Sequence, residues 1–169
     1  LSLSGCQTEK QTQSINPQAA AYNIQLGLAY LKQGSRQRAK QKLLMALTED
    51  PNSPYTNEAL AYYFEKTQEI PQAKYYYQKA VQLAPDTGAI LNNYAIFLCH
   101  QKKYTASNEY FLKAVSDPNY LNTALAFQNA GICALAAHRK KTAKYYFEKA
   151  LAQDPSLSEA KNELAIMST

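Results

Sequence analysis

Three cysteines and two histidines are the side chains of this 169-residue chain best suited to covalent or metal chemistry. Cys6 lies near the start of the sequence, whereas Cys99 and Cys133 lie far along it. A zinc site that combined the last two cysteines with His100 and His138 is not favoured, because Cys133 and His138 are five residues apart and would face different ways on a helix. We therefore predict no metal site, and a disulfide or a lipid as the more fitting cysteine chemistry.

The remaining composition gives no sign of an enzyme. The five glycines form no phosphate-binding loop, and the histidines lack the spacing of a nucleophile or metal site. The net charge of +5 permits an acidic partner, but Lys and Arg are mixed with Asp and Glu instead of forming a nucleic-acid patch. No stretch approaches the ~20 apolar residues that span a bilayer. We predict a non-enzymatic protein with no cofactor, no small-molecule substrate and no nucleic-acid partner.

Four similar segments recur along the chain: KQKLLMA from Lys40, KYYYQKA from Lys74, NEYFLKA from Asn108 and KYYFEKA from Lys144. Their starts are 34, 34 and 36 residues apart. This period resembles the tetratricopeptide (TPR) repeat, a 34-residue helix-turn-helix unit that stacks into a solenoid. Small residues recur at unit position 8 and large ones at position 24, which lets two helices cross closely while the large side chain fills the wedge between them. Position 8 holds Gly27, Ala61, Ala95 and Gly131, and position 24 holds Leu43, Tyr77, Phe111 and Phe147.

The pattern predicts an all-α right-handed TPR superhelix (α-solenoid) of about nine helices. We expect four full repeats, at about 20–53, 54–87, 88–123 and 124–157, and a partial repeat at 158–169. Helix-end signals agree: Asn16 precedes Pro17, Gly34 follows the first helix, and Pro71 sits where a second helix begins. Asp86 and Asp117 are expected to cap later helices, and Ser156 with Glu159 to form a capping box.

The aromatic residues have different expected roles according to their position in the repeat unit. Tyr77, Phe111 and Phe147 are expected in the core. The neighbouring rings at unit positions 22 and 23 have two open interpretations, either as amphipathic cover for the seams between repeats or as a contact surface for a partner. These rings belong to Tyr75, Tyr76, Tyr110, Tyr145 and Tyr146.

The TPR resemblance implies that the first helix of each repeat lines a concave groove. The candidate partner-binding residues at the groove positions are Tyr55, Tyr62, Asn92, Asn93, Ile96, Leu125, Gln128, Asn129 and Ile132. The same positions also hold Ile24, Leu28, Leu31, Glu58, Glu65 and His100. Asn93 and Asn129 share position 6, where a carboxamide can either bind a peptide backbone or tie one repeat to the next.

The start of the chain suggests a membrane anchor. Leu3-Ser4-Gly5-Cys6 resembles the lipobox of bacterial lipoproteins, which implies acyl chains on Cys6. Gln7 instead of Asp follows this cysteine, which implies the outer membrane, with the protein facing the periplasm. Residues 1–16 are then a lipobox remnant and polar tether, and residues 17–169 the TPR array. In an oxidising periplasm, Cys99 and Cys133 on successive first helices are candidates for a disulfide, with two buried thiols as the alternative.

These features together resemble one family. The lipobox, the tether and the repeats NNYAIFLC and QNAGICAL, separated by DPNYLNTALAF, are similar to the type IV pilus biogenesis and stability lipoproteins, the PilF/PilW pilotin family. The resemblance implies an outer-membrane scaffold that binds the type IV pilus secretin and promotes its localisation, multimerisation or stability. It identifies Cys99 and Cys133 as the family's cysteine pair. A TPR lipoprotein adaptor for another cell-envelope assembly machine is the alternative.

Overall fold

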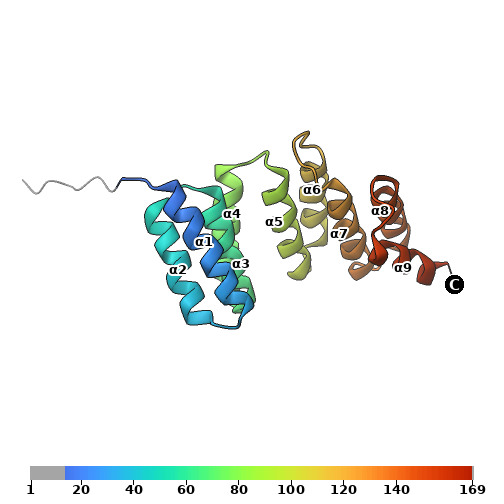
Figure 1. Cartoon of the computed structure of the whole chain (residues 1–169). Coiled ribbons are helices and arrows are strands. Elements are labelled where there is room, and N and C mark those ends of the chain that lie inside the picture. Colours follow the sequence, from blue (N-terminus) through green and yellow to red (C-terminus); the bar gives the residue numbers. More distant parts are fainter. Residues whose placement is uncertain (1–13, 169) are drawn as a thin grey trace, which may run out of the picture.

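The computed structural model describes residues 14–168, in which the chain forms helices and no strand. The helices form successive pairs stacked in one row, with short connections between neighbours (Figure 1). The first helices of the pairs contact one another in order along the row, from α1 to α9. The predicted all-α solenoid of about nine helices is therefore confirmed. The helices are α1 (Pro17–Lys32), α2 (Arg36–Glu49), α3 (Pro54–Lys66), α4 (Ile70–Leu83), α5 (Gly88–His100), α6 (Tyr104–Val115), α7 (Thr123–Ala136), α8 (Lys140–Gln153) and α9 (Ser158–Met167).

Local sequence signals set several helix ends as predicted. The Asn16 side chain accepts a hydrogen bond from the Ala19 N–H at 3.1 Å, and Pro17 is the first residue of α1. An N-cap of this kind satisfies one of the amide groups that the first turn leaves unpaired. Gly34 has a φ of 77°, the left-handed conformation that ends a helix at low cost for glycine. Pro71 lies in the first turn of α4.

The predicted capping box of α9 is wrong. This helix begins at Ser158 after an N-cap residue, Leu157, whose side chain makes no capping bond. The backbone N–H and the hydroxyl of Ser156 both donate to Asp154 Oδ1, at 2.9 and 2.6 Å. An aspartate two residues back is thus the nearer partner, and it holds Ser156 in the turn instead of the helix.

The predicted caps at Asp86 and Asp117 differ from the observed ones. Thr87, not Asp86, is the N-cap residue of α5, and its side chain makes no capping bond. The N–H of Gly88 is satisfied from a distance, because it donates to Asp117 Oδ2 at 2.8 Å from the loop between α6 and α7. Asp117 therefore stabilises the start of α5, and not that of the helix that follows it in sequence.

The small and large residues of each repeat meet as the pattern predicts. A Cβ added to Gly27 would come within 2.7 Å of the Leu43 side chain, and one added to Gly131 within 2.6 Å of the Phe147 ring. All four large residues at position 24 are buried. These contacts allow the two helices of a repeat to cross closely, so the repeat pattern follows from the packing of the core.

Tyrosines at unit position 23 pack into the seams between helices. Tyr76 stacks on Phe64 with ring centroids 5.5 Å apart, and Tyr110 meets the edge of Tyr94 at 4.7 Å. Tyr146 is buried, and its hydroxyl donates to Asn108 Oδ1 at 2.6 Å. The ring contacts of Tyr76 and Tyr110 thus lie within their own repeats, and only the Tyr146 hydrogen bond crosses to the repeat before its own. Cover of the seam between repeats therefore describes Tyr146 alone.

Tyrosines at position 22 lie on the surface instead. Tyr75 and Tyr145 are 59% and 53% exposed, respectively. Lys149 Nζ lies 5.6 Å from the centroid of the Tyr145 ring, a distance suited to a cation–π contact. A partner-contact role remains a prediction for these two side chains only.

A disulfide joins the third repeat to the fourth. It links Cys99 on α5 to Cys133 on α7, with the two Cα atoms 5.8 Å apart. The hydroxyl of Ser107 on α6 lies 3.4 Å from Cys133 Sγ and donates to the Ala95 carbonyl at 2.7 Å. The structure thus adopts the disulfide of the two alternatives that the sequence left open, and places it in the core of the array.

Candidate protein-binding groove

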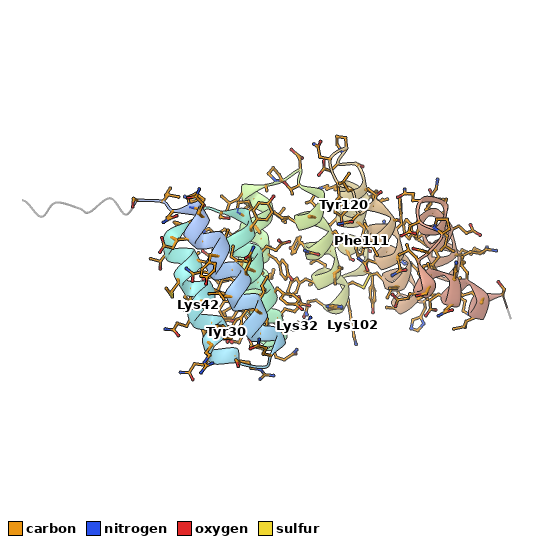
Figure 2. All side chains as sticks on the ribbon, viewed as in Figure 1. Tyr30, Lys32, Lys42, Lys102, Phe111 and Tyr120 are labelled. Carbon is orange, nitrogen blue, oxygen red and sulfur yellow. A yellow bond between two sulfur atoms is a disulfide. The ribbon has the colours of Figure 1, made fainter. Side chains whose placement is uncertain are left out.

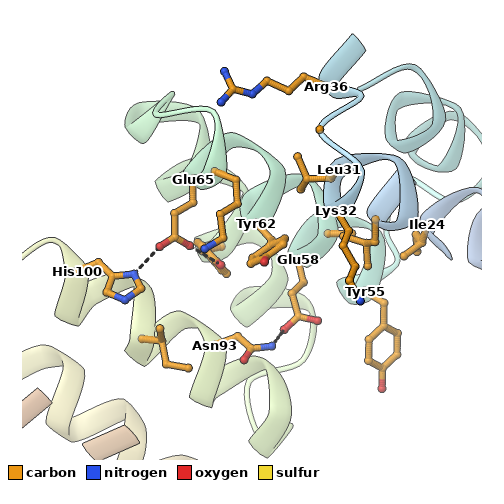
Figure 3. A pocket seen from close by; sticks show the side chains of 16 residues that line it. Ile24, Leu31, Lys32, Arg36, Tyr55, Glu58, Tyr62, Glu65, Asn93 and His100 are labelled. Atoms are coloured by element: carbon orange, nitrogen blue, oxygen red, sulfur yellow. Dashed lines mark hydrogen bonds and ion pairs between the residues drawn. The ribbon is translucent and has the colours of Figure 1, made fainter. Parts of the chain in front are cut away.

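The first helices of repeats one to three enclose a cavity of about 870 Å³. We call it the α3 groove, because α3 runs through its middle and α1 and α5 form its sides (Figure 3). Its lining consists of Ile24, Leu28, Leu31, Lys32, Gly34, Arg36, Tyr55, Glu58, Ala59, Tyr62, Glu65, Lys66, Tyr77, Asn93, Ile96 and His100.

Helical spacing explains the contribution of α3. Residues three or four apart on a helix share one face, and the groove side chains of α3 follow this rule along its length. Its lining residues are Tyr55, Glu58, Ala59, Tyr62, Glu65 and Lys66. The opposite face of α3 carries Leu60 and Phe64, which are buried in the core. One helix therefore supplies both the packing of the solenoid and the base of the groove.

The walls of the groove are apolar and aromatic. Ile24, Leu28 and Leu31 line it from α1, and Ile96 lines it from α5. Tyr55 and Tyr62 of α3 are 57% and 42% exposed although they lie in a concavity. Exposed tyrosines of this kind offer large contact areas with a polar tip, and such residues are enriched in protein interfaces.

Glu65 anchors a hydrogen-bonded group that joins three helices. The Tyr77 hydroxyl donates to Glu65 Oε2 at 2.9 Å, and His100 Nδ1 lies 2.7 Å from Glu65 Oε1 (Figure 3). Burial and the neighbouring Glu65 carboxylate raise the pKa of Tyr77 far above its usual range, so the phenol stays neutral and remains a donor. Both oxygens of Glu65 are engaged, which makes this carboxylate a structural element of the groove.

Glu58 is held differently. Asn93 Nδ2 on α5 donates to Glu58 Oε1 at 2.8 Å. Burial raises the pKa of Glu58, and the Asn93 hydrogen bond partly offsets that rise. Among residues 14–168, Glu58 forms no ion pair. Its carboxylate is therefore a half-buried charge in the groove without a cationic partner in the chain that the structure describes.

Basic residues lie along one end of the groove, where α1 and α3 end. Lys32 and Lys66 occupy the same position in successive repeats, and Arg36 lies at the start of α2. Lys66 Nζ lies 5.1 Å from the centroid of the Tyr62 ring. The Arg36 side chain extends away from Glu58 in Figure 3. The groove thus combines apolar walls, carboxylates at its base and cations at one end.

The structure brings together part of the predicted partner-binding set. Tyr55, Tyr62, Asn93 and Ile96 line the α3 groove. Asn92 does not line it, since its side chain is buried and its amide donates to Asn93 Oδ1 at 3.2 Å. The basic end of the groove was not predicted, although the shared repeat position of the two lysines was visible in the sequence.

The predicted residues of α7 do not line this cavity. The Gln128 amide donates to Glu159 Oε2 at 2.9 Å and its carbonyl accepts from the Ala160 N–H at 3.3 Å. Asn129 Nδ2 donates to Asn92 Oδ1 at 3.3 Å. These carboxamides tie one repeat to the next. Leu125 is 43% exposed and Ile132 half-buried, but both lie outside the α3 groove.

Position 6 shows the same use of carboxamides. Asn93 binds Glu58 of the second repeat and Asn129 binds Asn92 of the third, so each side chain reaches the repeat before its own. The structure therefore displays the repeat-tying interpretation of these residues. Contact of Asn93 with a bound peptide remains a prediction.

Two further expectations concern the membrane and metals. Cys6, the predicted lipid attachment site, lies outside the described residues. No helix in residues 14–168 is long and apolar enough to cross a membrane. The same residues contain no cluster of three or more His, Cys, Asp or Glu side chains arranged to hold a metal ion.

Known proteins similar to this chain share its architecture. Residues 86–156 match the tetratricopeptide repeat family. An uncharacterized protein of Haemophilus influenzae is 33% identical over 162 residues, which cover 96% of this chain and 90% of that protein. The type IV pilus assembly protein PilF of Pseudomonas aeruginosa is 36% identical over 148 residues. That match covers 88% of this chain but only 59% of PilF.

Solved structures agree with these matches. The structure of Pseudomonas aeruginosa PilF superposes with a TM-score of 0.82 at 35% identity, over 88% of this chain and 67% of that one. PilW, a widely conserved type IV pilus biogenesis factor, superposes with a TM-score of 0.83 at 28% identity, over 90% and 70% of the two chains. The resemblance inferred from the sequence is thereby confirmed. The chain belongs to the family of tetratricopeptide-repeat proteins of type IV pilus biogenesis that includes PilF and PilW.

Proposed function

We propose that this protein is an outer-membrane lipoprotein that binds the type IV pilus secretin and promotes its localisation, multimerisation or stability. Tetratricopeptide repeats mediate protein–protein interactions, and the relatives PilF and PilW act in type IV pilus assembly and biogenesis. The role is one of binding and scaffolding, without a catalytic step. The observation that carries it is the α3 groove, in a chain whose relatives are pilus biogenesis factors.

The chemistry of the groove suits a segment of protein. Its aliphatic walls offer burial to apolar side chains, which is the main driving force of association. Tyr55 and Tyr62 add aromatic area, and aromatic side chains in the centre of an interface commonly carry much of its binding energy. The Glu58 and Glu65 carboxylates and the Asn93 amide provide a few fixed polar groups, which select orientation and sequence.

Membrane attachment is the second part of the proposal. The lipobox resemblance of Leu3 to Cys6 supports acylation of the cysteine, and Gln7 after it supports the outer membrane. More than one acyl chain gives stable anchoring, whereas a single chain binds only marginally. A scaffold held at the outer membrane would meet the secretin where that protein inserts.

The test of the secretin role compares secretin multimers in cells. A strain that lacks the protein should contain fewer secretin multimers in its outer membrane, and the wild-type gene should restore them. A gene with Tyr55→Ala and Tyr62→Ala should restore few, because both rings are exposed in the groove. Tyr22→Ala is the matched control, since this tyrosine is similarly exposed on α1 but does not line the groove. Normal multimers in the deletion strain would disprove the secretin role.

The alternative adaptor role makes a different prediction. Capture with the lipidated protein from detergent-solubilised envelope should recover the secretin, and the Tyr55→Ala, Tyr62→Ala variant should recover less of it. Recovery of components of another envelope machine, without the secretin, would support the alternative. For the anchor, Cys6→Ala should move the protein from the membrane fraction to the soluble periplasm, and unchanged fractionation would refute acylation.

A further inference from the structure

Glu58 is a half-buried carboxylate of the α3 groove that forms no ion pair within residues 14–168. Its only hydrogen bond among the described residues comes from Asn93. By contrast, Glu65, two helical turns further along the same face of α3, binds both Tyr77 and His100. A carboxylate that loses water without gaining a cation is unfavourable, and burial raises the pKa of Glu58 accordingly. A cationic group of a ligand that paired with Glu58 would offset the desolvation of the carboxylate.

The surroundings of Glu58 favour a cation that arrives on an apolar carrier. Tyr55 lies three residues before it and Tyr62 four residues after it on α3, so the carboxylate sits between two aromatic side chains of one helix face. Aromatic faces attract Lys and Arg side chains, most strongly where water is excluded. Ile24 and Leu28 on one side and Ile96 on the other can bury the stem of such a residue and its apolar neighbours.

The cations of the chain itself do not fill this position. Lys66 lies over the Tyr62 ring, and Arg36 points away from Glu58 in Figure 3. Lys32 lines the same groove but forms no ion pair with Glu58. Lys32 is the last residue of α1 and carries its charge on a flexible stem.

We infer that the segment of the partner that occupies the α3 groove inserts a lysine or arginine side chain that pairs with Glu58, flanked by apolar residues that contact Ile24, Leu28 and Ile96. The groove is then selective for a basic residue in an apolar context, and not for an acidic tail. For the identity of the partner, the secretin, the inference rests on the proposed function. Lys32 also lines the groove, and its like charge opposes a basic ligand.

The experiment uses the full chain and peptides of 15 residues that tile the periplasmic part of the type IV pilus secretin. Fluorescence anisotropy measures their binding, and each bound peptide is remade with every Lys and Arg replaced by Gln. The neutral version should bind about tenfold more weakly or worse, since a charge-assisted hydrogen bond is lost. Glu58→Gln should weaken the parent peptide similarly and leave the neutral peptide unchanged, because the two changes remove one interaction.

Two variants control for folding and for general charge. Glu58→Gln keeps an oxygen that can accept the Asn93 hydrogen bond, so the groove should stay intact. Glu109→Gln makes the same charge change on the exposed face of α6 and should leave binding unaltered. Lys32→Met should tighten binding of the basic peptide, because it removes a like charge from the groove.

The outcomes separate this inference from the proposed function. If secretin peptides bind but their neutral versions bind equally well, or if Glu58→Gln leaves binding unchanged or improves it, the inference is wrong and the secretin role stands. If neither the peptides nor the intact secretin binds, the secretin role fails. A random 12-residue display library selected on the full chain then decides the inference: enrichment of Lys or Arg that disappears on Glu58→Gln supports it, and no such enrichment overturns it.

Discussion

Gly131 on α7 lies against the ring of Phe147 on α8, so closely that a Cβ at position 131 would come within 2.6 Å of the ring. Gly27 and Leu43 have the same relationship in the first repeat. The pair shows what the repeat pattern encodes: a missing side chain on one helix makes room for a large one on the next. Each such crossing then presents a surface on which the following repeat can stack.

Gly131→Ala is expected to destabilise the protein by about 1–3 kcal/mol, the usual cost of overpacking a core. Alanine is the better helix former by about 1 kcal/mol, so a net loss would mean that the clash with Phe147 outweighs helix propensity. Urea unfolding followed by circular dichroism measures the change. Phe147→Leu should cost less stability in the Gly131→Ala background than in the wild type, because the smaller side chain relieves the clash. A more stable Gly131→Ala variant would show that the ring can move aside.

Tyr77→Phe should lower stability by about 1–3 kcal/mol, because it removes a buried hydrogen bond to the Glu65 carboxylate. The pKa of Tyr77 is raised in the folded state, so the stabilisation is complete below the unfolded value near 10 and decreases as the pH rises above it. Thermal unfolding between pH 7 and 11 should therefore show the wild-type advantage shrinking at the alkaline end. Tyr145→Phe, at an exposed ring, is the control and should unfold like the wild type.

The disulfide between Cys99 and Cys133 should contribute about 2–4 kcal/mol, the usual range for such a bond. The double variant Cys99→Ser, Cys133→Ser should be less stable than the oxidised wild type by that amount. A thiol reductant should lower the stability of the wild type while leaving the variant unchanged. Equal stability of the oxidised and reduced wild type in urea would mean that packing of α5 against α7 does not depend on the bond.

Asp117 should stabilise the start of α5 in a pH-dependent way. Its pKa lies below the usual value because the Gly88 N–H and the Asn119 N–H donate to the carboxylate. The contribution is therefore present above the unfolded pKa of about 3.9 and is lost as the pH falls through the lower folded value. Asp117→Ala should lower the Tm at pH 7, and the difference from the wild type should vanish in strong acid. Asp86→Ala, at an exposed position in the preceding loop, is the comparison that should change little.

The fold could be predicted from the sequence because small and large residues recur in it with a regular period. Gly27 and Leu43 recur as Gly131 and Phe147 in register, and the spacing that repeats them also sets the helix pairs. Local caps such as Asn16 were predictable for a similar reason, since donor and acceptor lie three residues apart. The cap of α5 by Asp117 was not, because the loop that supplies it lies 29 residues further along the chain.

The groove was predictable only in part. Repeat positions identified which side chains of α3 and α5 face the concave side, among them Tyr62 and Ile96. They could not show that the Gln128 side chain on α7 donates to Glu159 and accepts from Ala160, because these hydrogen bonds depend on how the next helix packs. Nor could they distinguish Glu58 from Glu65, which share the same helix face and differ only in the partners that other helices bring to them.

The disulfide lies at one end of the stretch of helices that forms the α3 groove. It links α5 to α7, whereas no disulfide within residues 14–168 links α1, α3 and α5, which line the groove, to one another. The disulfide limits the relative displacement of α5 and α7, whereas the spacing of the earlier helix pairs depends on packing. We therefore expect the width of the α3 groove to adjust to an incoming segment more readily than the spacing of α5 and α7.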